Sequence, residues 1–371
     1  MNREENKQPL RILHVVTRMD AAGIETFIMN IYRQIDRNKI QFDFLTHRKQ
    51  EGFYDSEIKK MGGRIFRVPS INPFHHKNYI KELDKFFLNH QEYKIVHSHI
   101  NTFSMYVLRS AKKNEVPVRI AHSHISSVPL DYKFVFREYC RKRITEFPTD
   151  FFACSEDAGK WLYSRQKFEV INNGIDVNNF QFNANIRNKK RNELGVEGFY
   201  VLGNIGRFTS QKNQLFLLDI LKEVRKKEPK SKLLLVGKGR LKEKIQKKSK
   251  KLGLENNVII LEDRKDINEL LMAMDVFIFP SLYEGLGIVA VEAQAAGLPT
   301  LIAEKLPKEL RTSSLVREIS LEDSASYWGE CALKMKNIDR ENLELELLKN
   351  NFEITRITNA LQEFYLEKNS N

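Results

Sequence analysis

The chain has 371 residues, 42% of them hydrophobic, and a formal net charge of +13. This length exceeds what one hydrophobic core usually supports, so two domains are expected. The polar N-terminus and the lack of an apolar run long enough to cross a bilayer argue against a signal peptide and a membrane span, which predicts a cytoplasmic protein. Three widely spaced cysteines argue against a disulfide framework or a structural zinc site.

The first half of the chain alternates between strand-like and helix-like patterns. Apolar, β-branched runs predict strands at 11–16, 42–45, 64–68, 95–98, 118–121 and 151–155, with helical patterns at 28–35, 79–87 and 102–113. Alternation at this spacing predicts a parallel sheet covered by helices on both faces, as in a Rossmann-like domain.

Residues 178–198 then lose apolar density, which predicts a linker between domains. A second alternating series follows, with strands predicted at 200–205, 232–236, 258–261, 275–279 and 300–303 and helices at 215–224, 241–252 and 267–274. Past residue 320 the chain looks helical to its end. The pattern as a whole predicts an α/β protein of two doubly wound domains, 1–178 and 179–345, facing each other across a cleft.

The most informative stretch is residues 275–300, DVFIFPSLYEGLGIVAVEAQAAGLPT. A strand, a loop containing Gly285 and Gly287, and a helix follow one another here. The unpaired amides at the start of such a helix suit a phosphate. Because Glu284 and Glu292 would repel that phosphate, each is expected to face neutral hydroxyls, as in a sugar or a ribose. The arrangement suits a nucleotide sugar.

The spacing of these two acids resembles the donor-binding signature of retaining family-four glycosyltransferases of the GT-B fold. The resemblance implies that Glu284 contacts hydroxyls of the transferred sugar and that Glu292 contacts the nucleotide ribose. The loop amides of Gly285, Leu286 and Gly287 would hold the diphosphate and sugar. The alternative is that both acids are solvated and have no ligand.

Further segments of the second domain resemble the same family. In GNIGRFTSQKN, Arg207 and Lys212 match an arginine and lysine pair that binds the donor diphosphate, and both would neutralise charge on the leaving group. Gly237 lies in a glycine turn expected near the nucleotide, and Arg264 lies in the loop that meets the nucleobase in the family. No Asp-x-Asp sequence occurs, so no metal cofactor is expected.

The first domain supplies fewer candidates. Gly23 lies in a loop that the family usually writes with two glycines; Ala22 replaces the first, which leaves Gly23 as the residue expected beside the diphosphate and the acceptor. Histidines occur in two His-Ser-His segments at strand ends, 97–99 and 122–124. The resemblance favours His122 as a catalytic residue near the transferred sugar, with His99 second. A metal site and simple buried polar histidines are the alternatives.

The resemblance implies transfer of a hexose or N-acetylhexosamine from a UDP-linked sugar to a hydroxyl of a lipid-linked or saccharide acceptor. GLPTLIAEKLPKEL is similar to the matching segment of transferases that build bacterial capsule or exopolysaccharide. In that fold the last helix, expected within 346–371, packs back toward the N-terminal domain. Aromatic and basic residues interleave from Tyr132 to Phe147, which predicts peripheral contact with an anionic membrane surface at the inner leaflet.

Two other functions fit parts of the sequence. The first is a non-catalytic subunit that binds a sugar nucleotide or a polysaccharide on the same fold. The second, nucleic-acid binding, rests on the positive charge alone, because aromatic stacking platforms and a recognised motif are missing.

Overall fold

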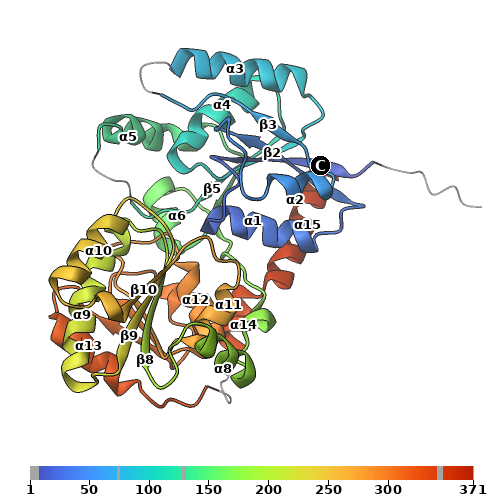
Figure 1. Ribbon diagram of the computed structural model, residues 1–371. Coiled ribbons are helices and arrows are strands. Elements are labelled where there is room, and N and C mark those ends of the chain that lie inside the picture. The colour runs from blue at the N-terminus through green and yellow to red at the C-terminus, as the bar shows by residue number, and fades with distance from the viewer. Residues whose placement is uncertain (1–7, 73–75, 128–130, 341–345, 371) are drawn as a thin grey trace, which may run out of the picture. The chain divides into compact units, whose positions relative to one another are not determined.

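The computed structural model describes residues 8–72, 76–127, 131–340 and 346–370 (Figure 1). It forms two compact units. The first contains the chain up to Ile175 and again from Ile354 onward, and the second is Asp176–Glu353. The predicted boundaries lay at 178/179 and 345/346, so the chain leaves the first unit three residues earlier and returns to it eight residues later than expected.

The first unit is built on a parallel seven-stranded sheet with the order β3-β2-β1-β4-β5-β6-β7. Its strands are β1 (Leu10–Val16), β2 (Ile40–Thr46), β3 (Ile65–Arg67), β4 (Ile95–Ser98), β5 (Val118–Ser123), β6 (Asp150–Ala153) and β7 (Glu169–Val170). Its helices are α1 (Gly23–Gln34), α2 (Asp55–Lys60), α3 (His76–Asn89), α4 (Ser104–Lys113), α5 (Phe134–Arg143), α6 (Glu156–Tyr163) and α15 (Ile354–Ser370), with short 3-10 turns η2 (Asn101–Phe103) and η3 (Ile144–Glu146). The order reverses between β1 and β4, where doubly wound sheets place their ligands.

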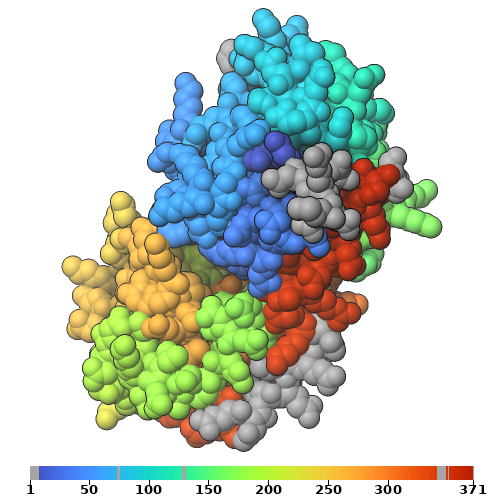
Figure 2. Space-filling model, turned by 90° about the vertical axis from the view of Figure 1, so that its right-hand side faces the viewer, coloured from blue at the N-terminus to red at the C-terminus, as the bar shows by residue number. Residues whose placement is uncertain are grey.

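The C-terminal helix α15 belongs to this first unit. It lies beside α1, and its red residues adjoin the blue N-terminal ones in the space-filling view (Figures 1 and 2). Tyr365 is fully buried, and Lys368 pairs with Asp150 at 2.6 Å. The preceding helix α14 (Glu346–Phe352) lies in the second unit, so only the last helix returns.

The second unit repeats the architecture with a parallel six-stranded sheet of order β10-β9-β8-β11-β12-β13. Its strands are β8 (Tyr200–Ile205), β9 (Ser231–Val236), β10 (Val258–Leu261), β11 (Val276–Phe279), β12 (Thr300–Ala303) and β13 (Val316–Ile319). Besides α14 its helices are α7 (Val177–Phe180), α8 (Ala184–Glu193), α9 (Gln214–Lys227), α10 (Lys242–Lys251), α11 (Ile267–Ala273), α12 (Ile288–Ala295) and α13 (Ala325–Lys334), with 3-10 turns η4 (Ser210–Lys212), η5 (Glu255–Asn257) and η6 (Lys308–Leu310). The predicted doubly wound α/β fold of each unit is confirmed.

The predicted linker at 178–198 is wrong, because this stretch contains α8, which packs on α11 inside the second unit. Hydrogen bonds and ion pairs of charged side chains, rather than an apolar stripe, attach α8 to the rest of the second unit. The Arg187 guanidinium donates to the main-chain oxygens of Met272 and Met274, each at 2.8 Å, and Lys190 pairs with Asp266 at 2.8 Å. A helix docked in this way has no hydrophobic periodicity for a sequence pattern to detect.

Candidate donor-binding site

Two loops meet where the strand order of the second unit reverses. The first follows β8 and the second follows β11, and these two strands are hydrogen-bonded neighbours. Gln211 ties the loops together, because its main-chain oxygen accepts from the Leu282 amide at 2.8 Å and its side chain donates to the Tyr283 oxygen at 2.9 Å. Gln211 was not predicted as a site residue, although it lies between Arg207 and Lys212 of the same motif.

Lys212 and Glu284 bring the two predicted motifs into direct contact. The Lys212 ammonium lies 2.7 Å from a Glu284 carboxylate oxygen, and the two side chains are only 16% and 8% exposed. The same ammonium lies 4.6 Å from the ring centroid of Phe279, a second contact that sequence reasoning missed. A cation held between a carboxylate and an aromatic face has a fixed position before any ligand binds.

Arg207 lies on the same loop but is exposed. Within the described residues its guanidinium makes no hydrogen bond or ion pair. Its main-chain oxygen accepts a hydrogen bond from the side-chain amide of the buried Gln214 at 2.9 Å. The backbone is therefore fixed and the charge is available. Together, Arg207 and Lys212 place two positive charges at the carboxyl end of β8, where an anionic ligand is expected.

The glycine loop after β11 starts helix α12 in the predicted way. Gly287 is the residue before the helix, has a φ of 91°, and no side chain caps the helix start. A Cβ at Gly287 would lie 2.9 Å from the Phe279 ring, so the position requires glycine for both space and backbone angle. Leu286 is buried, and the amides near the helix start are candidates for binding an anion.

Glu292 lies in the second turn of α12. Burial raises the pKa of its carboxyl to about 7, so near neutral pH the group is poised between its acid and its carboxylate. Hydrogen bonds donated by ligand hydroxyls would favour the carboxylate. Glu284 has a positively charged partner, because the Lys212 ammonium lies 2.7 Å from its carboxylate.

Gly237 and Arg264, the other residues of this unit predicted to contact the donor, make contacts within the protein that stabilise its loops. A Cβ on Gly237 would lie 2.2 Å from the Gly206 oxygen, so the turn after β9 packs directly on the loop that carries Arg207. Arg264 donates to Asp266 at 2.7 Å and lies 3.4 Å from a Glu193 oxygen, and Asp266 raises its pKa. Its predicted role at the nucleobase stays a prediction.

The candidates in the first unit lie at the carboxyl ends of β1, β4 and β5. Gly23 is the first residue of α1, directly after the loop from β1. Strand register places five histidines on one face of the sheet: His14 pairs with His97, and His99, His122 and His124 follow at two-residue steps that keep the same face. This face is packed by Phe27 of α1 and Tyr365 of α15.

The five histidines form two hydrogen-bonded chains, His14–His99–His124 and His97–His122. Ring nitrogens of His14 and His99 lie 3.0 Å apart, those of His99 and His124 2.9 Å, and those of His97 and His122 3.1 Å. Tyr365 extends the second chain at 2.6 Å from His97. Burial lowers the pKa of all five, to about 3 for His14 and His124, so the cluster is neutral at physiological pH.

The two histidines predicted near the transferred sugar, His122 and His99, are both buried in this cluster. His122 is 0% and His99 only 2% exposed, and of the two His99 lines a cavity of about 240 Å³ in the first unit. Both rings are therefore buried, and His99, the second choice from the sequence, is the one that borders a cavity. Two histidine trios, 14/97/99 and 99/122/124, have ring nitrogens within 4.8 Å of one another, close enough for one metal ion. Three pairs of these rings are already hydrogen-bonded to each other, which occupies ring nitrogens that a metal ion would need.

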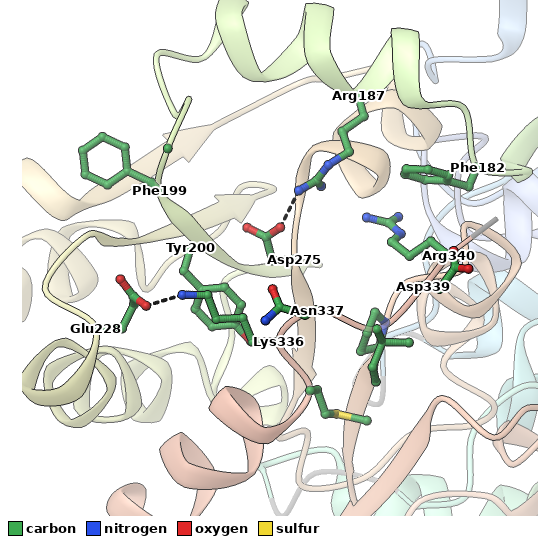
Figure 3. A pocket seen from close by; sticks show the side chains of 14 residues that line it. Phe182, Arg187, Phe199, Tyr200, Glu228, Asp275, Lys336, Asn337, Asp339 and Arg340 are labelled. Carbon is green, nitrogen blue, oxygen red and sulfur yellow. Dashed lines mark hydrogen bonds and ion pairs between the residues drawn. The ribbon is translucent and has the colours of Figure 1, made fainter.

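A second cavity, of about 380 Å³, lies in the second unit at the amino ends of β8 and β11, opposite to the carboxyl ends that carry the candidate site (Figure 3). Its charged groups are engaged: Arg187 pairs with Asp275, Lys336 pairs with Glu228, and Arg340 donates to several main-chain oxygens. No predicted site residue lines this cavity, and its arginines brace α8 and the end of α11.

Comparison with known proteins gives the family. The model for Glycosyl transferases group 1 matches residues 186–307, and that for Glycosyltransferase Family 4 matches residues 21–179. EpsF of Bacillus subtilis, described as a glycosyltransferase, is 33% identical over 335 residues, which cover 88% of this chain and 87% of EpsF. The capsular polysaccharide biosynthesis glycosyltransferase CapH of Staphylococcus aureus is 26% identical over 97% of this chain and 99% of its own.

Two further matches extend the comparison. An Escherichia coli enzyme, UDP-Gal:alpha-D-GlcNAc-diphosphoundecaprenol alpha-1,3-galactosyltransferase, is 27% identical over 79% of each chain. The structure of HepE from Anabaena, in complex with UDP and glucose, superimposes with a TM-score of 0.80 at 19% identity and covers 96% of this chain and 99% of HepE, a likeness of fold. The resemblance predicted from the sequence is confirmed, and the chain belongs to the family 4, group 1 glycosyltransferases.

Proposed function

We propose that this protein is a retaining, metal-independent glycosyltransferase that moves a hexose or N-acetylhexosamine from a UDP-linked sugar to an acceptor hydroxyl. The observation that carries the proposal is the 2.7 Å contact between Lys212 and Glu284. It joins a cation proposed to bind the diphosphate and a carboxylate proposed to bind sugar hydroxyls. Both lie beyond the carboxyl ends of β8 and β11, where doubly wound folds bind ligands.

Each residue of the site has a task in this reaction. Arg207 and Lys212 would offset the negative charge that grows on the nucleoside diphosphate as the glycosidic bond breaks, and charges already fixed in place cost little reorganisation. Glu284 would accept hydrogen bonds from the transferred sugar and Glu292 from the ribose. The amides from Gly285 to Gly287 would hold the diphosphate.

For the histidine that faces substrate we favour His99 over His122, because His99 lines a cavity and His122 is enclosed. Its lowered pKa keeps the imidazole neutral, and both of its ring nitrogens are bonded to His14 and His124, so it would contact a ligand through its ring face or edge unless one of these bonds is exchanged. Gly23 is proposed near the same ligand on the grounds of its loop position after β1 alone.

The donor nucleotide and the acceptor class follow the relatives. HepE was solved with UDP and glucose, and the E. coli relative uses UDP-Gal and a diphosphoundecaprenol-linked sugar. We propose a UDP-sugar and a lipid-linked acceptor for this chain, in the assembly of a capsule or exopolysaccharide.

The test is incubation of the purified protein with a panel of UDP-sugars, with slow donor hydrolysis followed by UDP release and the anomer of the released sugar by proton NMR. Retention should give the same anomer as the donor. Glu284→Ala and Arg207→Ala should each reduce turnover by about a hundredfold or more. Lys247→Ala, which removes an exposed cation on α10, is the matched control. Binding of UDP without turnover of any donor would instead favour a non-catalytic sugar-nucleotide subunit.

We also propose that α5 rests on an anionic bilayer. Tyr132, in the turn before α5, and Val135 and Tyr139, in the helix, are 79%, 78% and 46% exposed, and the four-residue spacing of the last two puts them on one side of the helix. Lys133 lies over the Tyr132 ring, and Arg143 donates to the Tyr139 hydroxyl at 2.8 Å, so cations flank the apolar stripe. In the part of the chain that the structure describes, no helix combines the length and apolar character needed to cross a bilayer.

Vesicle co-sedimentation tests the bilayer contact. Serine at all three stripe positions should abolish binding to vesicles rich in phosphatidylglycerol, whereas Leu88→Ser, which alters an apolar side chain 62% exposed on α3, should not. Binding that survives the triple substitution would place the membrane contact elsewhere.

A further inference from the structure

The arginines near the amino end of β11 carry an inference about the donor site. Arg187, Arg191 and Arg340 donate hydrogen bonds to main-chain oxygens at the end of α11. Arg340 also reaches α12, the helix that carries Glu292. We propose that Arg340 is a positioning residue that holds α12, and with it Glu292, in place to bind the ribose of the donor. The inference rests on the proposed transferase function and assigns a residue outside every motif predicted from the sequence.

Arg340 joins the ends of two helices. One terminal nitrogen of its guanidinium donates to the main-chain oxygens of Met272 and Met274 at 3.2 and 2.8 Å. The other donates to the oxygen of Ala296, the residue that ends α12, at 2.7 Å, and to that of Leu271 at 3.3 Å. The last carbonyl groups of a helix have no partner within the helix and carry partial negative charge, and a guanidinium satisfies both needs. One planar group thus links α11 to α12.

The bond to α12 distinguishes Arg340 from the other two arginines. Arg187 donates to the same oxygens of Met272 and Met274, each at 2.8 Å, and Figure 3 shows the guanidinium groups of Arg187 and Arg340 on the wall of one cavity. Arg191 donates to a further main-chain oxygen of α11 at 2.8 Å. Neither Arg187 nor Arg191 donates to α12 in the part of the chain that the structure describes. The end of α11 therefore keeps partners without Arg340, whereas the end of α12 loses one.

A short path connects Arg340 to Glu292. The Ala296 amide donates to the main-chain oxygen of Glu292 at 3.0 Å, so the residue that Arg340 holds closes the helical turn that carries this acid. Helix α12 has only eight residues, and contacts outside so short a helix decide where it lies. The buried Gln294 ties the side of the helix to the oxygen of Leu310 at 2.9 Å. Arg340 adds a separate anchor at the end of α12, one turn from Glu292.

The surroundings of Arg340 are unfavourable for a charge, which argues for a specific task. Its guanidinium lies 4.4 Å from the ring centroid of Phe182, and burial lowers its pKa to about 9, with the charge of Arg187 adding to this effect. Burying a cation costs free energy unless its hydrogen bonds are good, and Arg340 meets that condition with main-chain oxygens of two helices. Buried charged groups can serve to fix one arrangement of the chain, which is the role proposed for Arg340.

Hydrogen exchange of the full chain without ligand tests whether Arg340 holds α12. Arg340→Met should raise the exchange rate of the amides in residues 292–297 by about tenfold, because the end of the helix opens more often. Arg187→Met is the matched control, since it removes bonds to the same two oxygens of α11 but none to α12. It should raise exchange at the end of α11 and leave residues 292–297 unchanged. Unchanged exchange of residues 292–297 in Arg340→Met would overturn the inference.

The affinity for UDP, measured by calorimetry, tests whether Arg340 acts through Glu292. Arg340→Met should weaken UDP binding by roughly 3- to 30-fold, the range for a residue that acts through an intervening element, and Arg187→Met should change it by less than about twofold. In a Glu292→Ala background, Arg340→Met should have almost no further effect, because the group that it positions is gone. A purely structural role predicts the same factor in both backgrounds, and that result would overturn the inference.

The outcome is separable from that of the proposed function. If UDP-sugars are turned over but Arg340→Met and Arg187→Met weaken UDP alike, the function stands and the inference is wrong. If UDP binds and the coupling to Glu292 is seen but no UDP-sugar is turned over, the inference stands and the transferase function fails. Thermal unfolding shows whether each variant is folded. Arg340→Lys, which keeps the charge but replaces the planar fork with one nitrogen, should show the same pattern with smaller factors and serves if Arg340→Met does not fold.

Discussion

The buried histidine cluster predicts that the first unit loses stability in mild acid while the second does not. All nine histidines of the chain lie before Ile175, and residues 176–353 contain none. The five clustered rings have pKa values lowered by burial, so in the folded state they stay neutral where the unfolded chain takes up protons. The unfolded state then binds more protons, and stability falls as pH drops below about 6.5.

The size of the effect follows from linkage. For a group of unfolded pKa 6.5 that stays neutral in the fold, acidification from about pH 7.5 to 5.5 costs about 1.4 kcal/mol. Five such groups give about 7 kcal/mol, as large as the whole unfolding free energy of many domains. Acid should therefore unfold the first unit between about pH 6 and 5, a range in which ordinary surface groups change stability little.

The two tryptophans report on the two units separately. Trp161 lies in the first unit and Trp328, fully buried, in the second. Trp328→Phe leaves a probe of the first unit and Trp161→Phe a probe of the second. Urea unfolding followed by fluorescence at pH 7.5 and 5.5 should show a steep loss for Trp161 and almost none for Trp328. Glu292, whose raised pKa has the opposite sign, should make the second unit slightly more stable in acid.

A matched substitution tests the assignment to the cluster. His14→Phe places an aromatic ring of similar shape beside Phe42, whose ring centroid lies 4.1 Å from that of His14, and removes one titrating group. The pH dependence of the first unit should shrink by about 1.4 kcal/mol whatever the variant does to stability at neutral pH. Equal acid sensitivity of both units, or an unchanged slope in this variant, would refute the reasoning.

Three further predictions concern the donor site. Lys212→Met should weaken UDP binding by about tenfold or more in calorimetry, since it removes the cation placed by Glu284. Because the Glu292 carboxyl has a pKa of about 7, UDP affinity should fall about tenfold from pH 8 to pH 6 beyond the change seen in Glu292→Gln; an identical pH profile in that variant would contradict this. Gly237→Ala should destabilise the second unit by about 2 kcal/mol or more in urea titrations, because its Cβ would lie 2.2 Å from the Gly206 oxygen.

Patterns within short stretches of the sequence were enough to predict most strands and helices and the loop between β11 and α12. β4, β8, β10 and β12 begin and end at the residues predicted, because strands of a sheet covered by helices on both faces are rich in apolar residues. The stretch from β11 to α12 is also local: its glycine loop and its two acids are contiguous in the chain, so their spacing could be read directly. The short edge strand β13 was missed, since four residues that are only partly buried give too weak a pattern.

Contacts between distant segments were beyond the reach of such patterns. The pairing of Lys212 with Glu284 depends on β8 lying next to β11, which the order of strands along the chain does not state. The enclosure of His122 depends on helix α1, far earlier in the chain, whose Phe27 packs edge-on against its ring, and on Phe152 of β6. Helix α8 escaped detection because charges bound to main-chain oxygens hold it.

The sequence alone thus determined the alternating elements, the parallel sheets and the residue types of the loops proposed to bind the donor, because periodicity and loop composition act within a few residues. Only the tertiary structure decided which charges meet, which histidine borders a cavity, and that one face of α5 lines this cavity while the other is exposed. Those properties arise from strand order and burial, which bring together residues far apart in the chain and set their exposure and pKa values.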